Sequence, residues 1–384
     1  MNRLSLLVGL KNNLDYSKHF YKTTRELYPT VEICFVSYGS IDGTHEWLAT
    51  LDDNNVKYYY STEQKTFSDT FNKASDIATK EYVAYLHNDI VLAPGFIENL
   101  EKHISRDNVI SYTTVEPPIF TGHERPGKVI KDFGASLETF RKDNLFEFVT
   151  KIQQEYKNQT ELGITFFMCL SREVLLSIGG LDNLYNPMFC EDDDLIFRLK
   201  LKQLNLLTSL DSICYHFVSK TSRFSDDYKN KTQQIEKNSN RNFIRKWGSR
   251  VPKVRYNIGF RILKCNSEFL EFLEPWCNNI LIDDEMQVLT SHYIDKEQKN
   301  TLFKLNERIK STPFESLNNE IIVTINRETF TQQDFQIIQQ LPEIIKDSGE
   351  IGEFQIENLL ITIKQMNEYQ NNLIKIQNEN NKMS

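Results

Sequence analysis

An imidazole, an amide and a carboxylate stand together where an apolar run breaks off. His87, Asn88 and Asp89 follow the apolar residues 82–86, and the apolar character resumes at 90–92. In an open parallel sheet, ligands bind at the carboxyl ends of the strands. A carboxylate placed there can hold Mg²⁺ or Mn²⁺, which commonly bridges to substrate phosphates. The triplet therefore indicates a cation site, and the alternative is a polar strand end that only meets solvent.

Two other apolar runs end in polar residues. Residues 37–44, SYGSIDGT, follow a strand-like run and open a helix, where Gly39 permits a tight turn and Ser40 or Asp42 can cap the helix. A lone histidine, His216, ends the run 212–217. A neutral imidazole is a good ligand for Mn²⁺-class metals. The alternatives are an ordinary link between strand and helix and a hydrogen-bonded core histidine.

Four acidic residues in a row, 191–194, precede the apolar residues of a predicted helix. Their mutual repulsion is partly offset at a helix N-terminus, where the dipole favours each anion by roughly 0.3–1 kcal/mol. That effect alone can account for the run. The functional alternative is a general base directed into a cleft.

The segments that carry these residues belong to an alternation of strands and helices. Alternation of this kind predicts a mostly parallel α/β sheet covered by helices on both faces, and the continuous apolar runs fit burial on both sides. The predicted strands are 4–10, 31–36, 56–60, 82–86 and 109–113, and the predicted helices are 14–27, 42–51, 67–78 and 94–104.

The pattern loosens over 113–160 and changes again near 254. Strands are expected at 162–170, 204–210 and 212–217, and a basic stretch then leads to a helix that ends at Trp247 and Gly248. Beyond 255, helical patterns dominate, with one strand at 320–325 and a capping box formed by Thr331 and Asp334. We expect a first domain over 1–254 and a mainly helical accessory domain over 255–384.

Composition narrows the class of protein. The net charge of −8 argues against non-specific binding to nucleic acid. No run of about 18 apolar residues is present, so no membrane span is expected, and the N-terminal apolar run is too short for a signal peptide. The six cysteines are scattered without a CxxC pair. Reduced core cysteines in a cytoplasmic protein are therefore expected.

The order and spacing of these stretches strongly resemble the inverting family 2 glycosyltransferases of the GT-A type. The turn at 39–44, the strand end at 87–89, GGLD at 179–182, the acidic helix start at 191 and the Tyr-His pair at 215–216 occur in the order of that family. The resemblance covers about residues 4–250. Trp247 and Gly248 are similar to the rhamnosyltransferase-like branch. No known motif identifies 255–384.

The resemblance implies a role for each matching residue. Asp89 and His216 would hold a divalent cation, Mn²⁺ or Mg²⁺, and Asp192, with Glu191 beside it, would be the general base. The donor would be a nucleoside-diphosphate sugar, with a UDP-sugar as the expected form. The residues assigned to the nucleotide or its diphosphate are Ser37, Tyr38, Asp42, Asn72, His87, Asn88, Lys220 and Arg223.

Two departures from the family pattern bear on these roles. Ser37 and Tyr38 stand where the family usually has acidic or amide residues, so the identity of the nucleotide is open. His87 replaces the first aspartate of the DxD motif. That replacement removes one anionic group, and lower affinity for the metal is expected.

Three hypotheses about function stay open from the sequence. The first is a metal-dependent inverting glycosyltransferase whose acceptor is a saccharide or another hydroxylated molecule. The second is the same enzyme with a hydroxylated base in DNA as its acceptor. The DNA hypothesis stems from the strand-end triplet and a chain that resembles phage-encoded glycosyltransferases. A basic face would support it, although a solvated surface is the favoured interpretation of those residues: Lys220, Arg223, Lys229, Lys231, Arg241, Arg245, Lys246, Arg250 and Lys253.

The third hypothesis is a non-catalytic module that binds a sugar nucleotide, motivated by His87, Ser37 and Tyr38. A sugar nucleotidyltransferase would need a Gly-rich basic loop after the first strand, which residues 9–12 do not provide. Residues 255–384 could select the acceptor, bring the protein near a membrane or form a homo-oligomer, and their sequence leaves all three open.

Overall fold

The computed structural model describes residues 3–119, 125–218, 230–282, 287–311 and 316–376. The chain forms two compact units, Met1–Gln233 and Gln234–Ser384. None of the helices in these described ranges combines the length and the apolar character that a membrane span requires.

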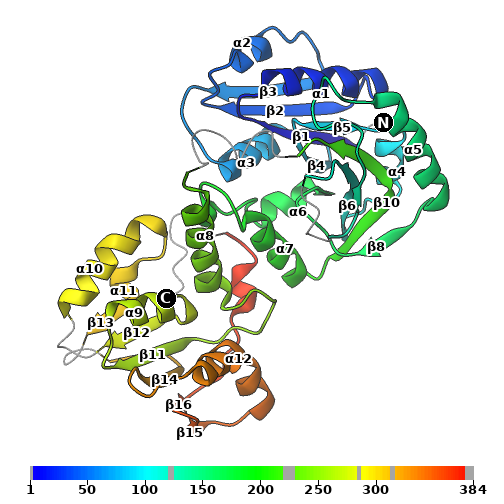
Figure 1. Cartoon of the computed structure of the whole chain (residues 1–384). Helices are drawn as coiled ribbons and strands as arrows, with labels where there is room; N and C mark the ends of the chain where they lie inside the picture. The colour runs from blue at the N-terminus through cyan, green and yellow to red at the C-terminus, as the bar shows by residue number, and fades with distance from the viewer. Residues whose placement is uncertain (1–2, 120–124, 219–229, 283–286, 312–315, 377–384) are drawn as a thin grey trace. The chain divides into compact units, whose positions relative to one another are not determined.

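The first unit is built on one large mixed sheet (Figure 1), in the order β3-β2-β1-β4-β9-β6-β10-β5, with β7 beside β6 and β8 beside β10. Pairing is parallel across β3, β2, β1 and β4 and between β6 and β10, whereas β9, β5 and β8 pair antiparallel with their neighbours. The strands are β1 Leu4–Leu10, β2 Glu32–Tyr38, β3 Val56–Ser61, β4 Tyr82–His87, β5 Ile90–Leu92, β6 Asn108–Glu116, β7 Lys128–Ile130, β8 Thr160–Leu162, β9 Met168–Ser171 and β10 Asn205–His216.

Helices cover both faces of this sheet, as predicted. Phe20 of α1 packs edge-on against Phe35 of β2, with ring centroids 6.1 Å apart. Phe71 of α3 packs against Tyr85 of β4 at 5.3 Å. Phe35 and Leu86 both pair with Val8, so Tyr85 lies on the other face and α1 and α3 cover opposite sides. The helices of the first unit are α1 Leu14–Leu27, α2 Thr44–Ala49, α3 Phe67–Ile77, α4 Phe96–Glu101, α5 Lys142–Glu155, α6 Arg172–Ser177 and α7 Glu191–Leu201.

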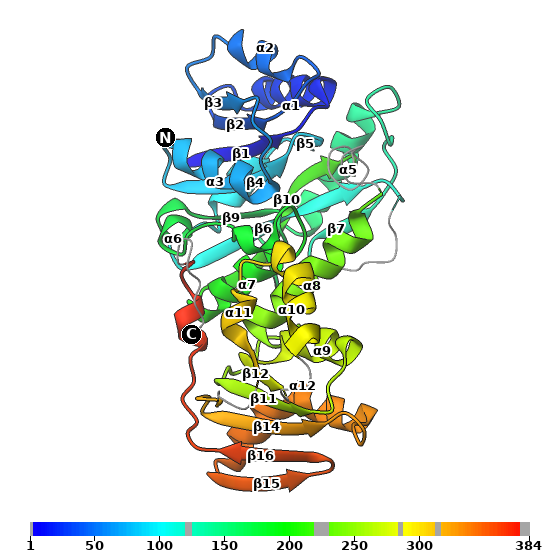
Figure 2. The ribbon, with the colours of Figure 1, turned by 90° about the vertical axis from the view of Figure 1, so that its left-hand side faces the viewer.

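The second unit contains helices and also a sheet, of which the sequence analysis expected a single strand at 320–325. Six strands lie in the order β13-β12-β11-β14-β16-β15, most of which can be followed in Figure 2. Most of these strands are apolar runs of three to six residues, too short for periodicity to separate strand from helix. The elements are β11 Ile258–Leu263, α9 Ser267–Leu273, β12 Asn279–Ile282, α10 Gln287–Glu297, α11 Leu305–Arg308, β13 Ile309–Ser311, β14 Ile321–Asn326, α12 Gln332–Ser348, β15 Gly352–Ile356 and β16 Leu359–Ile363.

Most of α8, Thr232–Trp247, belongs to the second unit, because the division between the units falls between Gln233 and Gln234. Arg245 on α8 is fully buried, and its Nη2 lies 2.6 Å from both Glu274 Oε2 and Glu297 Oε1. Arg241 pairs with the same two carboxylates at 3.3 and 2.9 Å. A buried arginine needs such partners. Arg241 and Arg245, which the sequence analysis placed on a basic face, therefore form ion pairs in the interior of this unit.

Candidate active site

Three side chains from the ends of two strands meet in the first unit. His87 ends β4, Asp89 lies between β4 and β5, and His216 ends β10. Because β10 runs antiparallel to β5, His216 is paired with Ile90. The amide of Phe217 donates to the carbonyl oxygen of Asp89 at 3.0 Å. The strand pairing therefore places His216 next to Asp89, as the sequence predicts.

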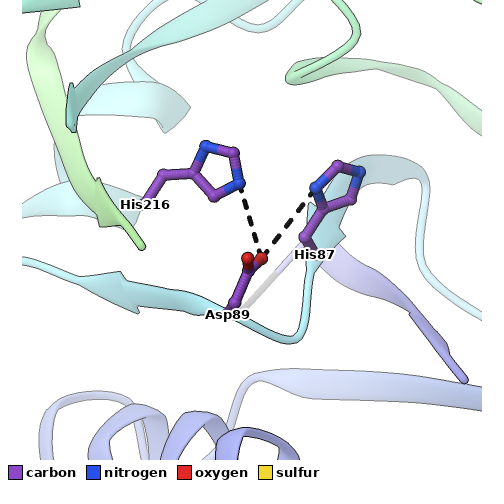
Figure 3. Close-up of side chains that lie close together, drawn as sticks. All are labelled: His87, Asp89 and His216. Carbon is purple, nitrogen blue, oxygen red and sulfur yellow. Dashed lines mark ion pairs between the residues drawn. The ribbon is translucent and has the colours of Figure 1, made fainter. Parts of the chain in front are cut away.

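The three side chains form a compact donor cluster (Figure 3). His216 Nε2 lies 3.4 Å from Asp89 Oδ1, and His87 Nδ1 lies 4.0 Å from the same oxygen. One donor atom from each residue lies within 4.8 Å of the other two. A cation bound at about 2.0–2.2 Å separates its ligand atoms by roughly 3–4.4 Å. The cluster fits a divalent cation after a small contraction.

Glu116, the last residue of β6, orients the His216 ring. Its Oε1 lies 3.2 Å from His216 Nδ1 and also accepts hydrogen bonds from Thr114 and Arg125. Lys128 Nζ lies 4.0 Å from Glu116 Oε2. With Nδ1 directed to Glu116, the other ring nitrogen faces Asp89. A carboxylate that fixes the ring of a ligating histidine in this way is common at metal sites.

Sequence reasoning missed Glu116. The one available signal was its position: Glu116 is an acidic residue directly after the strand-like segment 109–115, just as the polar triplet directly follows 82–86. No family motif marks this position.

The protein environment shifts the pKa values of the two histidines in opposite directions. Burial lowers the pKa of His87 to about 4, although the charge of Asp89 partly opposes this shift. Burial also disfavours a charged His216, but the carboxylates of Asp89 and Glu116 outweigh it and raise its pKa to about 9. Despite burial, contacts with His216 and Arg125 hold the pKa of Glu116 below its usual value. At neutral pH His87 is therefore neutral, and His216 carries a positive charge that balances the two acids.

Aromatic rings surround the histidines. The ring centroids of Phe166 and Phe167 lie 5.2 and 5.0 Å from that of His87, and Phe167 lies 5.0 Å from His216. These rings remove water from one side of the cluster. Ion and dipole interactions are stronger there than in bulk solvent.

A cavity of about 600 Å³ adjoins the charged partners of Glu116. Arg125 and Lys128 line it, so the cavity and the Glu116–His216 pair share two positive charges. The cavity walls also include Thr113, Ile152, Tyr156 and Glu161.

The acidic run at the start of α7 divides into different environments. Asp194 is fully buried, binds Arg198 Nε at 2.8 Å and accepts from the Tyr185 hydroxyl at 3.2 Å. Glu191 is buried, and burial together with the neighbouring acids raises its pKa well above the usual value. Asp193 is exposed and Asp192 is half-buried. Asp192 is not a member of the three-residue donor cluster.

Several residues assigned to the nucleotide bind the protein itself. Asp42 accepts from the backbone amides of Leu14 and Thr44, at 2.8 and 3.2 Å, and so ties together the loops that follow β1 and β2. The side chain of Asn72 bonds the backbone N–H and C=O of Leu181, each at 2.8 Å. These contacts position loops around the strand ends.

The other residues that the sequence analysis assigned to the nucleotide differ in their exposure to solvent. Ser37 is fully buried, and its hydroxyl lies 2.8 Å from Ser40 Oγ and 3.1 Å from His45 Nε2. The buried amide of Asn88 donates to the Ser17 hydroxyl at 2.9 Å. Tyr38 is half-buried. Lys220 and Arg223 lie outside the described residues.

The first unit has an α/β fold of the GT-A type, a mostly parallel sheet with helices on both faces, and the donor cluster lies at the ends of its strands. Residues 5–178 match the family model described as glycosyl transferase family 2. The match covers less than half of the chain, and it shows that residues 5–178 are similar to this family. No curated protein matches the sequence.

Three solved structures are distantly similar to the chain. A mannosyltransferase, PcManGT from Pyrobaculum calidifontis in complex with GDP-Man and Mn²⁺, has 18% identity and a TM-score of 0.40 over 57% of this chain and 58% of that one. GalNAc-T7 with UDP, GalNAc and Mn²⁺ has 12% identity and a TM-score of 0.41 over 56% and 42%. S. aureus TarS 1-349 has 13% identity and a TM-score of 0.41 over 64% and 72%. Similarities this low carry no conclusion about substrate or metal.

Proposed function

We propose that this protein is a metal-dependent, inverting glycosyltransferase. It transfers a sugar from a nucleoside-diphosphate sugar, with a UDP-sugar as the first candidate, to the hydroxyl group of a saccharide or another hydroxylated acceptor. The observation that carries the proposal is the His87–Asp89–His216 cluster at the strand ends of a domain that is similar to family 2.

The metal part of the proposal follows from the charge of the leaving group. A bound divalent cation supplies neutralisation of the negative charge that develops on the departing diphosphate. Asp89 and His216 would hold this cation. Glu116 would act as a positioning residue, because its contact with Nδ1 leaves Nε2 of His216 directed toward Asp89.

Asp192 is the best candidate for the general base among the four acids. Asp194 is engaged by Arg198, and burial raises the pKa of Glu191, which disfavours its charged form. In the proposed step, the acceptor oxygen forms a bond to the anomeric carbon while the bond to the diphosphate oxygen breaks. The diphosphate leaves with the electron pair, the hydroxyl proton moves to Asp192, and attack from the opposite face inverts the centre.

Tyr38 is the residue best placed to contact the nucleobase. Its ring lies 5.6 Å from that of Tyr59, and Lys73 lies 4.6 Å from the Tyr59 ring centroid. Such an aromatic surface supports stacking of a base, whereas the Ser37 hydroxyl is already bonded within the protein. Recognition of uracil in particular stays a prediction, as do the rhamnosyltransferase-like branch, a phage origin and a cytoplasmic location.

A saccharide or other small acceptor is favoured over DNA. Arg241 and Arg245, two members of the proposed basic face, pair with carboxylates inside the second unit, and Lys246 is also buried. Lys220, Arg223 and Lys229 lie outside the described residues. Loss of three cations from the face weakens the electrostatic case for nucleic acid.

A screen of nucleotide sugars tests the proposal. We would measure release of nucleoside diphosphate with and without Mn²⁺, for the wild type and for the Asp89→Ala, Asp192→Ala double variant. Cation-dependent release that the double variant lacks supports the proposal. Equal release from both proteins would reject it, and binding of a sugar nucleotide without turnover over a broad acceptor panel would favour the non-catalytic module.

A further inference from the structure

The donor cluster contains two imidazoles and only one carboxylate. His87 and His216 both face Asp89, at 4.0 and 3.4 Å from its Oδ1 (Figure 3). Asp89 is buried to 1% exposure, so its carboxylate sits in a largely enclosed site. Glu116 is the nearby second acid, but its Oε1 is already bonded by His216 Nδ1, Thr114 and Arg125. A cation in this site would meet two nitrogen donors and one anionic oxygen.

The surroundings of His87 leave its ring directed at the cluster. Its Nδ1 is the nitrogen that faces Asp89, and its Nε2 is buried without a hydrogen-bond partner in the described part of the chain. The neighbouring rings of Phe67, Phe166 and Phe167 offer only aromatic contacts. No polar group in these contacts competes with a cation for the His87 ring.

This donor set discriminates between cations. Mg²⁺ is a hard ion that takes oxygen ligands and gives up its water reluctantly. Imidazole ligands suit first-row transition metals, and two histidines with one carboxylate are a familiar donor set for such ions. An aspartate at position 87, as in the family pattern, would instead provide two carboxylates and a site that accepts Mg²⁺ more readily.

Resting on the proposed function, we infer that His87 is the third metal ligand and that the site selects a first-row transition-metal cation over Mg²⁺. Residue 87 therefore belongs to the metal site and not to the nucleotide site. The replacement of aspartate by histidine changes which cation is bound, instead of only weakening binding.

Direct cation binding tests this inference without an acceptor or a donor. Binding of Co²⁺, Mn²⁺ and Mg²⁺ would be measured by isothermal titration calorimetry, and the visible absorption of bound Co²⁺ would report on its ligands. We expect the wild type to bind Co²⁺ and Mn²⁺ at least about tenfold more tightly than Mg²⁺. His87→Asp should reduce the Co²⁺ to Mg²⁺ affinity ratio by about tenfold or more and change the Co²⁺ spectrum.

A matched control is available within the same unit. His103 Nε2 lies 3.9 Å from Asp211 Oδ1, and within the described residues this pair belongs to no cluster of three metal-donor groups, so His103→Asn should leave both the affinity ratio and the spectrum unchanged. His87→Asn, which adds no charge beside Asp89, serves if His87→Asp does not fold, and it should weaken Co²⁺ binding by about tenfold or more.

The outcomes separate the two proposals. Equal affinity of the wild type for Mg²⁺ and Mn²⁺, or unchanged Co²⁺ binding in a folded His87 variant, would overturn the inference while leaving a metal-dependent transferase intact. No binding of any cation by the wild type, or Co²⁺ binding that Asp89→Ala leaves unchanged, would remove the metal site itself.

Discussion

Asp89 Oδ1 lies 3.4 Å from His216 Nε2 because the antiparallel pairing of β5 with β10 sets Ile90 opposite His216. A backbone ladder therefore holds this pair of side chains, and the cluster does not depend on the conformation of a long loop. Side chains that rigid strands hold in place favour a cation site whose geometry is set before the cation binds.

Asp89→Ala should abolish the effect of Mn²⁺ on the reaction. The variant removes the only carboxylate of the donor cluster, and nucleoside diphosphate release in Mn²⁺ should fall by about 10²-fold or more. Asp76→Ala on α3 is a suitable control because Asp76 is exposed. Full cation-stimulated turnover by Asp89→Ala would contradict the assignment of the metal ligand.

Asp192→Asn should slow transfer without weakening substrate binding. Loss of a positioned base lowers kcat by roughly 10²–10⁴-fold, whereas the dissociation constants for cation and donor should stay near those of the wild type. Asp193→Asn provides the comparison, since Asp193 follows directly in the same helical turn and is exposed. If both variants lost the same activity, the effect would belong to the helix start and not to a base at Asp192.

Glu116→Gln should weaken cation binding while the fold is kept. The amide cannot hold the Nδ1 proton of His216 as a carboxylate does, and loss of such an outer partner typically costs about 10–100-fold in metal affinity. Calorimetric titration with Mn²⁺ measures this change. Glu173→Gln, which alters a surface pair with Arg106, should have no effect. Unchanged affinity in Glu116→Gln would show that Glu116 does not position the ring.

The second unit should lose stability in acid through Glu274. Burial alone would raise the pKa of this group, but the positive charges of Arg245 and Arg308 outweigh it and lower the pKa from 4.5 to about 2. A lowered folded-state pKa contributes stability that is complete above about pH 4.5. That stability is lost as the pH falls from there toward 2. Urea unfolding at several pH values should show this decline.

Glu274→Gln should remove that dependence on pH and destabilise the unit at pH 7. Removing one partner of a buried ion pair typically costs about 3–5 kcal/mol. Glu268→Gln, an exposed acid on α9, should keep both the neutral stability and the acid decline. An acid decline of the same size in Glu274→Gln would assign it to other carboxylates.

Local patterns in the sequence were sufficient for much of the first unit and for the core of the site. The alternation of apolar runs predicted β1, β2, β3 and β4 and the helices between them, because strand and helix periodicities are local properties. The capping box at Thr331 and Asp334 is present at the start of α12 for the same reason. Asp89 and His216 could be singled out as polar residues that end apolar strands.

Contacts between distant segments decided the rest. A single strand, β10, replaces the two predicted over 204–210 and 212–217, with a register shift between Ser209 and Ile213. The sheet of the second unit could not be inferred from the sequence. Its strands are too short to show a clear periodic pattern, and they are stabilised by pairing with neighbouring strands. The buried positions of Arg241 and Arg245 depend on Glu274 and Glu297, which lie far along the chain.

By itself, the sequence determined the class of fold, the family resemblance and two residues of the candidate cation site, because those depend on local patterns and on the order of short motifs. Only the tertiary structure decided that His87 turns toward Asp89, that Glu116 holds the far side of His216, and that Asp42 and Asn72 bond backbone groups. The physical reason is pairing between distant segments: β6 and β5 flank β10, so Glu116 at the end of β6 and Asp89 just before β5 both lie next to His216.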